Sequence, residues 1–174
     1  MLKPKASPSG DLAAAWFDDP SFHWRDERLL RAEPLLPVWQ VPELVLLRPR
    51  LGATAVLYNP SAFAVSEPIA DALRTPELEL LPIDVAGAGR YHLLHPLIAL
   101  DTPKGASLRL SETNGNLVQI RSLPDFRPEA RVFRFRHPRF SEAGRAGLLH
   151  PWIFTNDAAR FSGVSEWIEL HAVG

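Results

Sequence analysis

Seventeen prolines in 174 residues are the feature that most restricts what this chain can fold into. Proline is present at about twice its average share of roughly 5%. Each one removes a backbone donor, fixes φ and pushes the preceding residue out of the α region. Only residues 104–123 and 152–174 form long stretches without proline, and the first contains Asn114-Gly115, a turn pair. Long helices are therefore excluded, and we expect strands and short helices.

The length and composition predict one folded domain over residues 1–174, because the 46% share of hydrophobic residues is enough to fill a core of that size. Residues 1–10 contain Lys, Pro, Ser and Gly with almost nothing apolar, so we expect them to form a flexible tail. The apolar run at residues 12–15 is too short for a signal peptide, and no apolar stretch is long enough to cross a membrane. A cytoplasmic protein is expected.

The first half of the chain predicts a strand, a capped helix and a second strand. Residues 54–58 and 78–85 are typical of strands. Between them, the Ser66 hydroxyl is expected to accept a hydrogen bond from an early helical N–H. Pro68 fits the first turn of a helix, where its missing N–H costs nothing. Thr75-Pro76 is expected to end the helix.

The middle of the chain predicts a β-hairpin. Residues 91–100 are apolar but interrupted by Pro96, so they form either an edge strand or two pieces. Residues 107–110 and 117–121 then alternate apolar and polar side chains on either side of Asn114-Gly115. This pair supplies the positive φ that a type I′ turn requires, which indicates a hairpin.

The last third predicts further strands and a second capped helix. Residues 131–136 alternate, which places Phe133 and Phe135 on one face and Val132, Arg134 and Arg136 on the other. The remaining expected elements are a strand over 148–154 broken by Pro151, a one- to two-turn helix capped by Thr155 or Asn156 and ended by Gly163, a strand over 166–173, and a short helix over 25–32 ended by Pro34.

These elements predict an α+β fold, a mainly antiparallel sheet with two short capped helices. At an offset of 90 residues, Val65-Ser66-Glu67 aligns with Thr155-Asn156-Asp157, and Leu78-Glu79-Leu80 aligns with Ile168-Glu169-Leu170. This similarity indicates either a weak internal duplication of a strand-helix-strand unit or a coincidence, because one cap and one alternating strand recur in most α+β domains.

No arrangement of residues points to a catalytic or metal site. The chain has no cysteine, which excludes disulfides and thiolate zinc sites. His92 and His95 would suit two metal ligands on a helix, but in a strand a spacing of three directs them to opposite faces. We therefore expect no metal, no cofactor and no enzymatic activity. The alternative is a small hydrolase-like enzyme that uses scattered His and carboxylate groups.

Charge is unevenly distributed, although the formal net charge of −1 argues against a dedicated nucleic-acid binder. Either the protein steers toward a charged partner, or its acidic and basic regions neutralise each other. A nucleic-acid-binding module in which Phe133 and Phe135 stack on bases is a further alternative, but these side chains are expected in the core. The acidic region contains Glu67, Asp71, Glu77, Glu79 and Asp84, and the basic region contains Arg121, Arg127, Arg131, Arg134, Arg136, Arg139 and Arg145.

Five motifs follow one another between residues 41 and 170. They are Pro42-Glu43-Leu44, Phe63-Ala64-Val65-Ser66, an apolar stretch from Tyr91 to Asp101, Val132-Phe133-Arg134-Phe135 and Ile153-Phe154-Thr155-Asn156. In this order they resemble the immunity protein 11 family of bacterial polymorphic-toxin systems. Glu43 stands where that family usually has Asp, Thr155 or Asn156 stands where it has Ser, and the glycine that leads its final strand is not clearly present.

The resemblance implies a small cytosolic protein that binds and occludes a cognate toxin, and it brings no catalytic residues. A typical specific interface covers about 800 Å² on each partner and includes a few aromatic or Arg anchors. We expect these anchors to come from Arg131, Arg134, Arg136 and Arg139.

Overall fold

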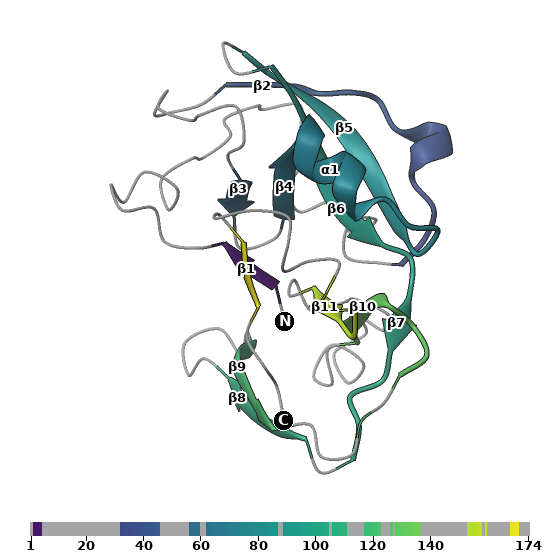
Figure 1. Cartoon of the computed structure of the whole chain (residues 1–174), viewed down its shortest axis with the longest axis vertical. Helices are drawn as coiled ribbons and strands as arrows, with labels where there is room; N and C mark the ends of the chain where they lie inside the picture. Colours follow the sequence, from purple (N-terminus) through teal and green to yellow (C-terminus); the bar gives the residue numbers. More distant parts are fainter. Residues whose placement is uncertain are drawn as a thin grey trace.

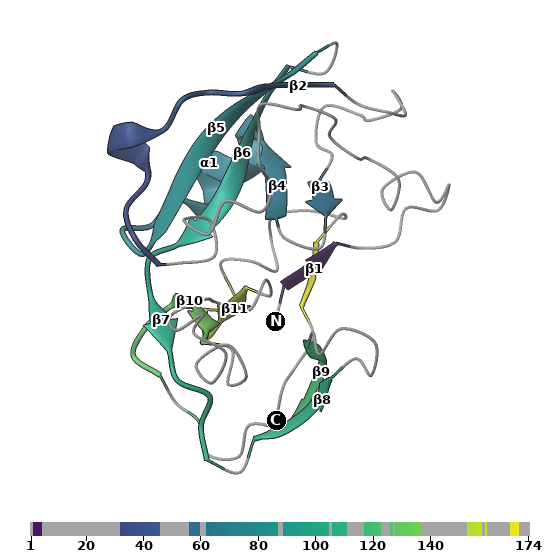
Figure 2. The same cartoon turned by 180° about the vertical axis from the view of Figure 1, so that it is seen from behind.

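The computed structural model describes residues 2–4, 32–45, 56–59, 62–86, 89–104, 106–110, 117–122, 126, 128–136, 153–157, 159 and 168–170. Within these residues, one α-helix accompanies strands that form mixed sheets, so the fold is α+β (Figures 1 and 2). Antiparallel pairs of described strands outnumber parallel pairs, in agreement with the predicted mainly antiparallel sheet.

The largest sheet has five strands in the order β2-β5-β6-β4-β3. Its long central pair, β5 and β6, is antiparallel, and Gly89 begins β6 with a φ of 93°, a backbone conformation that favours glycine. On the other side of β5, the short strand β2 runs parallel to it. The strands are β2 (Glu43–Val45), β3 (Val56–Asn59), β4 (Ala62–Ser66), β5 (Leu78–Ala86) and β6 (Gly89–Pro96).

Helix α1 (Glu67–Leu73) lies on one face of this sheet, between β4 and β5 in the chain (Figure 1). Pro68 occupies its first turn, as predicted. Ser66 occupies the N-cap position, but its buried hydroxyl makes no capping bond and has no hydrogen-bond partner. The predicted side-chain cap is therefore wrong. Ser66 is also the last residue of β4 and pairs with Tyr91, so its side chain points to the sheet face away from α1.

A second, three-stranded sheet follows directly from β6. Strand β6 ends at Pro96, and the next strand is β7 (Ala99–Leu100), so the apolar run of residues 91–100 forms two strands. The first of them is a central strand of the large sheet and not an edge strand. β10 (Val132–Phe135) pairs parallel with β7 and antiparallel with β11 (Phe154–Thr155). Pro96 removes a donor at the point where the chain leaves one sheet for the other.

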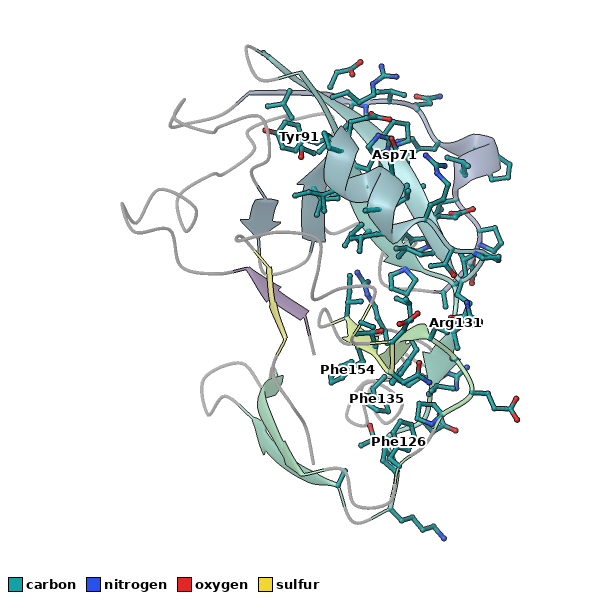
Figure 3. All side chains as sticks on the ribbon, in the orientation of Figure 1. Asp71, Tyr91, Phe126, Arg131, Phe135 and Phe154 are labelled. Carbon is teal, nitrogen blue, oxygen red and sulfur yellow. The ribbon has the colours of Figure 1, made fainter. Side chains whose placement is uncertain are left out.

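β10 separates two apolar clusters because its side chains alternate. Val132 packs with α1 and the large sheet, in a cluster that includes Val65, Ile69, Leu73, Leu80, Leu94 and Ile153. Phe133 and Phe135 pack on the other side against Phe126 and Phe154, with ring centroids 4.8 to 6.0 Å apart (Figure 3). The predicted phenylalanine face is confirmed as core.

The remaining described strands form two separate two-stranded sheets. β8 (Ser107–Leu110) and β9 (Leu117–Ser122) form the predicted hairpin. β12 (Ile168–Leu170), within the predicted last strand, pairs antiparallel with β1 (Leu2–Pro4). Three residues of the predicted flexible tail therefore belong to a sheet. Their partner lies more than 160 residues away in the chain, so no local pattern could reveal the pairing.

Several predicted features lie wholly or mostly outside the described residues. They are the helix over 25–32, the Asn114-Gly115 turn, the strand before Phe154 and the helix capped by Thr155 or Asn156. The two members of the sequence repeat are connected differently. β4 and β5 flank β6 in one sheet, whereas β11 and β12 belong to different sheets.

Candidate functional site

The outer edge of β5 is covered by an irregular segment that the sequence did not reveal as an element. β2 pairs only with Asp84, Val85 and Ala86, the last residues of β5. Residues 33–42, here called the strap, run along the earlier part of β5 and include the short 3₁₀ helix η3 (Leu36–Val38). Figures 1 and 2 show the strap as the blue segment that leads along β5 to β2.

A carboxylate from β5 holds the start of η3. Glu79 Oε2 accepts hydrogen bonds from the backbone N–H of Leu35, at 2.7 Å, and of Leu36, at 3.2 Å. The first N–H groups of a helix have no partner within the helix, and a carboxylate placed there satisfies them. Glu79 therefore fixes where η3 begins.

The second half of the strap is held by the backbone of β5. Trp39 Nε1 donates to the Pro82 carbonyl at 2.7 Å, and the Asp84 N–H donates to the Pro42 carbonyl at 2.9 Å. Proline is tolerated in a strand where its missing N–H faces away from the ladder. Pro82 leaves only an acceptor at this point of the edge, and the indole N–H is a donor without acceptor capacity.

A buried histidine holds the beginning of the strap. His95 Nε2 lies 2.8 Å from the Glu33 carbonyl oxygen, and it donates because a carbonyl only accepts. Burial lowers the pKa of His95. The charge of Arg134 acts in the same direction, while the Glu33 carbonyl and the charge of Glu79 oppose it. In the neutral ring that burial favours, Nε2 carries the proton that binds the Glu33 carbonyl.

The strap presents three aliphatic side chains to solvent. Leu36 is 50% exposed, Val38 63% and Val41 44%, and they are the exposed large hydrophobic residues of the part of the chain that the structure describes. Single exposed apolar residues are ordinary, but three within six residues of one held segment make a candidate contact surface. A signal was present in the sequence, because residues 34–42 contain three prolines and no charged residue.

The four arginines predicted as anchors do not form one surface. Arg131 is exposed, and its backbone N–H donates to Glu77 Oε2 at 2.7 Å (Figure 3). Arg136 is exposed and pairs with Asp101 at 3.0 Å. Arg134 is only 2% exposed and donates to the Leu94 carbonyl at 3.4 Å. Arg139 lies outside the described residues.

The burial of Arg134 follows from the alternation of β10. Arg134 lies on the same face as Val132, which packs in the core beneath α1. Burial lowers the pKa of Arg134 to about 10, still high enough to keep the guanidinium charged near neutral pH. The Phe133 and Phe135 rings are buried as well, at 4% and 2% exposure, so neither is available to stack on a base.

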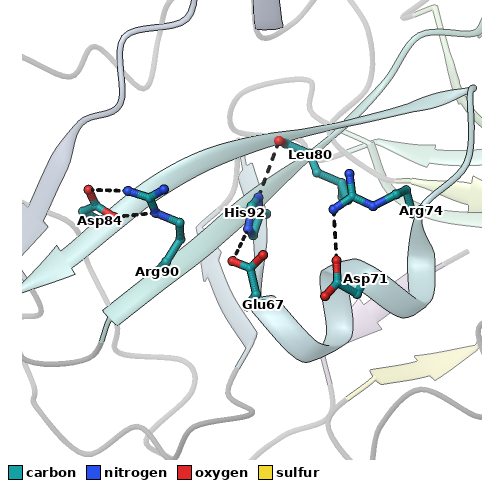
Figure 4. Close-up of polar contacts among 7 residues, drawn as sticks. All are labelled: Glu67, Asp71, Arg74, Leu80, Asp84, Arg90 and His92. Carbon is teal, nitrogen blue, oxygen red and sulfur yellow. Dashed lines mark hydrogen bonds and ion pairs between the residues drawn. The ribbon is translucent and has the colours of Figure 1, made fainter.

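Each of the five acids in the first strand-helix-strand unit has a partner within the protein. Three use side chains: Glu67 lies 2.7 Å from His92 Nε2, Asp71 lies 2.9 Å from Arg74, and Asp84 binds Arg90 through two contacts of 2.8 and 3.0 Å (Figure 4). The hydrogen bond from Arg90 lowers the pKa of Asp84. Glu79 binds the strap, and Glu77 accepts from the N–H groups of Arg131 and Val132.

Among the described residues, four of the five acids of the acidic region bind groups outside the basic region. His92 and His95 point to opposite sheet faces, as predicted, toward α1 and toward the strap respectively. No group of three or more His, Asp or Glu side chains among the described residues is placed to hold a metal ion.

Two further findings concern the chain as a whole. In the described part, no helix has the length and apolar character needed to cross a membrane. Neither protein-family models nor curated proteins yielded a match to this chain.

Proposed function

We propose that this protein is a toxin-neutralising immunity protein that binds a cognate bacterial toxin in the cytoplasm and blocks it by occlusion. The order of its motifs, from Pro42-Glu43-Leu44 to Ile153-Phe154-Thr155-Asn156, supports a family relationship with the immunity 11 proteins. The observation that carries the proposal is the group of exposed side chains at Leu36, Val38 and Val41. A stoichiometric binder needs such a surface and needs no converging catalytic groups.

The hydrogen bonds that hold the strap in place favour a role in partner binding. Association costs free energy for each side chain and loop that becomes ordered, and a segment already held in place reduces that cost. Glu79, His95 and Trp39 supply such restraints along the strap. Exposed aliphatic residues on a held segment are therefore suited to binding.

Only some of the arginines that were predicted as anchors remain candidate contacts in this proposal. Arg131 and Arg136 are exposed and remain candidate contacts at the rim, where charges affect association rates more than affinity. Arg134 has a structural role instead, because it is buried beneath β6 residues that include Leu94. The proposed fold also includes a second capped helix between Asn156 and Gly163, and the internal duplication remains part of the hypothesis.

The test is co-purification with the protein encoded by the neighbouring reading frame. The tagged chain is co-expressed with that protein, captured at low salt and analysed for stoichiometry and for host growth. We expect a complex of fixed ratio and loss of the neighbour's toxicity. Failure to retain the neighbour, together with undiminished toxicity, would contradict the proposal.

A further inference from the structure

We propose that the strap is the contact that enters the partner, and that the partner receives it in an uncharged apolar cleft. The inference rests on the proposed function, because it names the surface through which that function acts. Leu36, Val38 and Val41 supply the apolar contact. The mode of recognition follows from the strap's backbone, its restraints and its charge.

The backbone of the strap is largely unable to pair with a partner strand. Strand addition at a sheet edge depends on free backbone N–H and C=O groups. Three of the residues from 34 to 42 are prolines and have no N–H, and four of the remaining six N–H groups donate inside the protein. The prolines are Pro34, Pro37 and Pro42, and the internal donors are Leu35, Leu36, Val38 and Trp39. Recognition must therefore act mainly through side chains.

Those side chains project from a segment that is fixed at both ends. At one end, Glu33 accepts from His95 and Glu79 holds Leu35 and Leu36, while at the other end Pro42 accepts from Asp84. The 3₁₀ turn between them keeps Leu36 and Val38 exposed. An apolar segment that is already held in place loses little conformational entropy when it enters a concave site.

The charge pattern favours a protein cleft over a lipid surface. Segments that bind anionic membranes combine apolar residues with Lys and Arg. Residues 34–42 of the strap carry no charge, whereas Glu33 at its start and the Glu79 carboxylate that binds Leu35 and Leu36 are acidic and would repel an anionic surface. An uncharged protein cleft would bury the aliphatic side chains without leaving a charge unpaired.

The experiment compares two variants of the full chain for binding to the purified toxin domain of the neighbouring protein. The strap variant carries Leu36→Ser, Val38→Thr and Val41→Thr, which remove apolar surface without adding charge. The control variant carries Ala72→Ser and Ala86→Ser, the same kind of change at exposed positions away from the strap. Titration calorimetry gives affinity and stoichiometry, and light scattering gives the mass of each free protein.

We expect the strap variant to bind about 100-fold more weakly, because buried anchors dominate protein interfaces. The control variant should bind within about 3-fold of the wild type. A strap variant that folds and binds like the wild type would overturn the inference while leaving the proposed function intact. Absence of binding by the wild type would instead overturn the proposed function and this inference with it.

Two further outcomes identify a different occupant of the strap. If the wild-type chain is a dimer and the strap variant is a monomer, the strap is covered by a second copy and the inference is wrong. If the wild type binds anionic phosphatidylserine vesicles and the strap variant does not, the occupant is a membrane and the inference is also wrong. The inference is supported if the wild type is a monomer that does not bind vesicles and the strap variant loses binding to the toxin domain.

Discussion

Leu36, Val38 and Val41 of the strap lie at the surface, whereas Arg134 of β10 lies in the interior. Leu and Val are usually buried and Arg is usually exposed, so both regions depart from the usual burial of these residue types. The strap can expose aliphatic groups because Glu79 and other internal partners satisfy its polar backbone. β10 buries the Arg134 guanidinium, whose Nη2 donates to the Leu94 carbonyl. Residue type alone therefore does not show which of these side chains reach the surface.

The largest effect is expected when the buried cation is removed. Arg134→Ala should lower the free energy of unfolding by about 3 kcal/mol, because it leaves a cavity and removes the donor to the Leu94 carbonyl. Arg136→Ala, which breaks an exposed pair with Asp101, should cost less than about 1 kcal/mol. Urea unfolding of both variants measures the difference. Equal losses would mean that the two arginines do not differ in role.

A smaller effect is expected at the carboxylate that holds the strap. Glu79→Gln replaces a charged acceptor of two backbone N–H groups and should cost about 1 to 2 kcal/mol. Amide hydrogen exchange should accelerate at Leu35 and Leu36 and remain unchanged in β6. The exposed Asp71→Asn variant is the control. Unaltered exchange at Leu35 and Leu36 in the Gln variant would show that Glu79 does not hold the strap.

The stability of the folded chain should also depend on pH through His95. Burial lowers the pKa of His95 in the folded protein, so below its ordinary value of about 6.5 the unfolded chain binds a proton that the folded chain does not. The stability that His95 contributes is therefore complete above pH 6.5 and is lost as the pH falls below it. We expect His95→Gln to flatten this part of the stability profile. A variant that loses stability on acidification as steeply as the wild type would contradict this role.

The smallest effect on stability is expected from the exposed side chains of the strap. Leu36→Ser, Val38→Thr and Val41→Thr together should change the free energy of unfolding by less than about 0.5 kcal/mol per site, because these groups are already largely in water. Thermal unfolding measures the change. A loss comparable to that of Arg134→Ala would show that the strap side chains serve the core and not a partner.

The local elements of this fold were accessible from the sequence. Period-two alternation revealed the hairpin of β8 and β9 and the phenylalanine face of β10, and Pro68 with Thr75-Pro76 marked the ends of α1. These features depend on residues close in the chain, where periodicity and turn chemistry are informative.

Non-local features were not accessible in the same way. The pairing of β1 with β12, the parallel pairing of β2 with β5 and the position of the strap depend on contacts between distant residues. Alternation separated Arg134 from the phenylalanines but could not show that both faces of β10 are covered. Residue type therefore points to the arginines as the binding site, although the uncharged, proline-rich residues 34–42 are also visible in the sequence.

The most direct test of the central claim is a comparison of the two regions in one binding experiment. The affinity of the cognate toxin domain is measured for the strap variant and for an Arg131→Ala, Arg136→Ala variant, both with folding verified. We predict a loss of about 100-fold for the strap variant and less than about 5-fold for the arginine variant, since exposed rim charges contribute little affinity. The reverse order, with the arginines dominant and the strap neutral, would contradict the account.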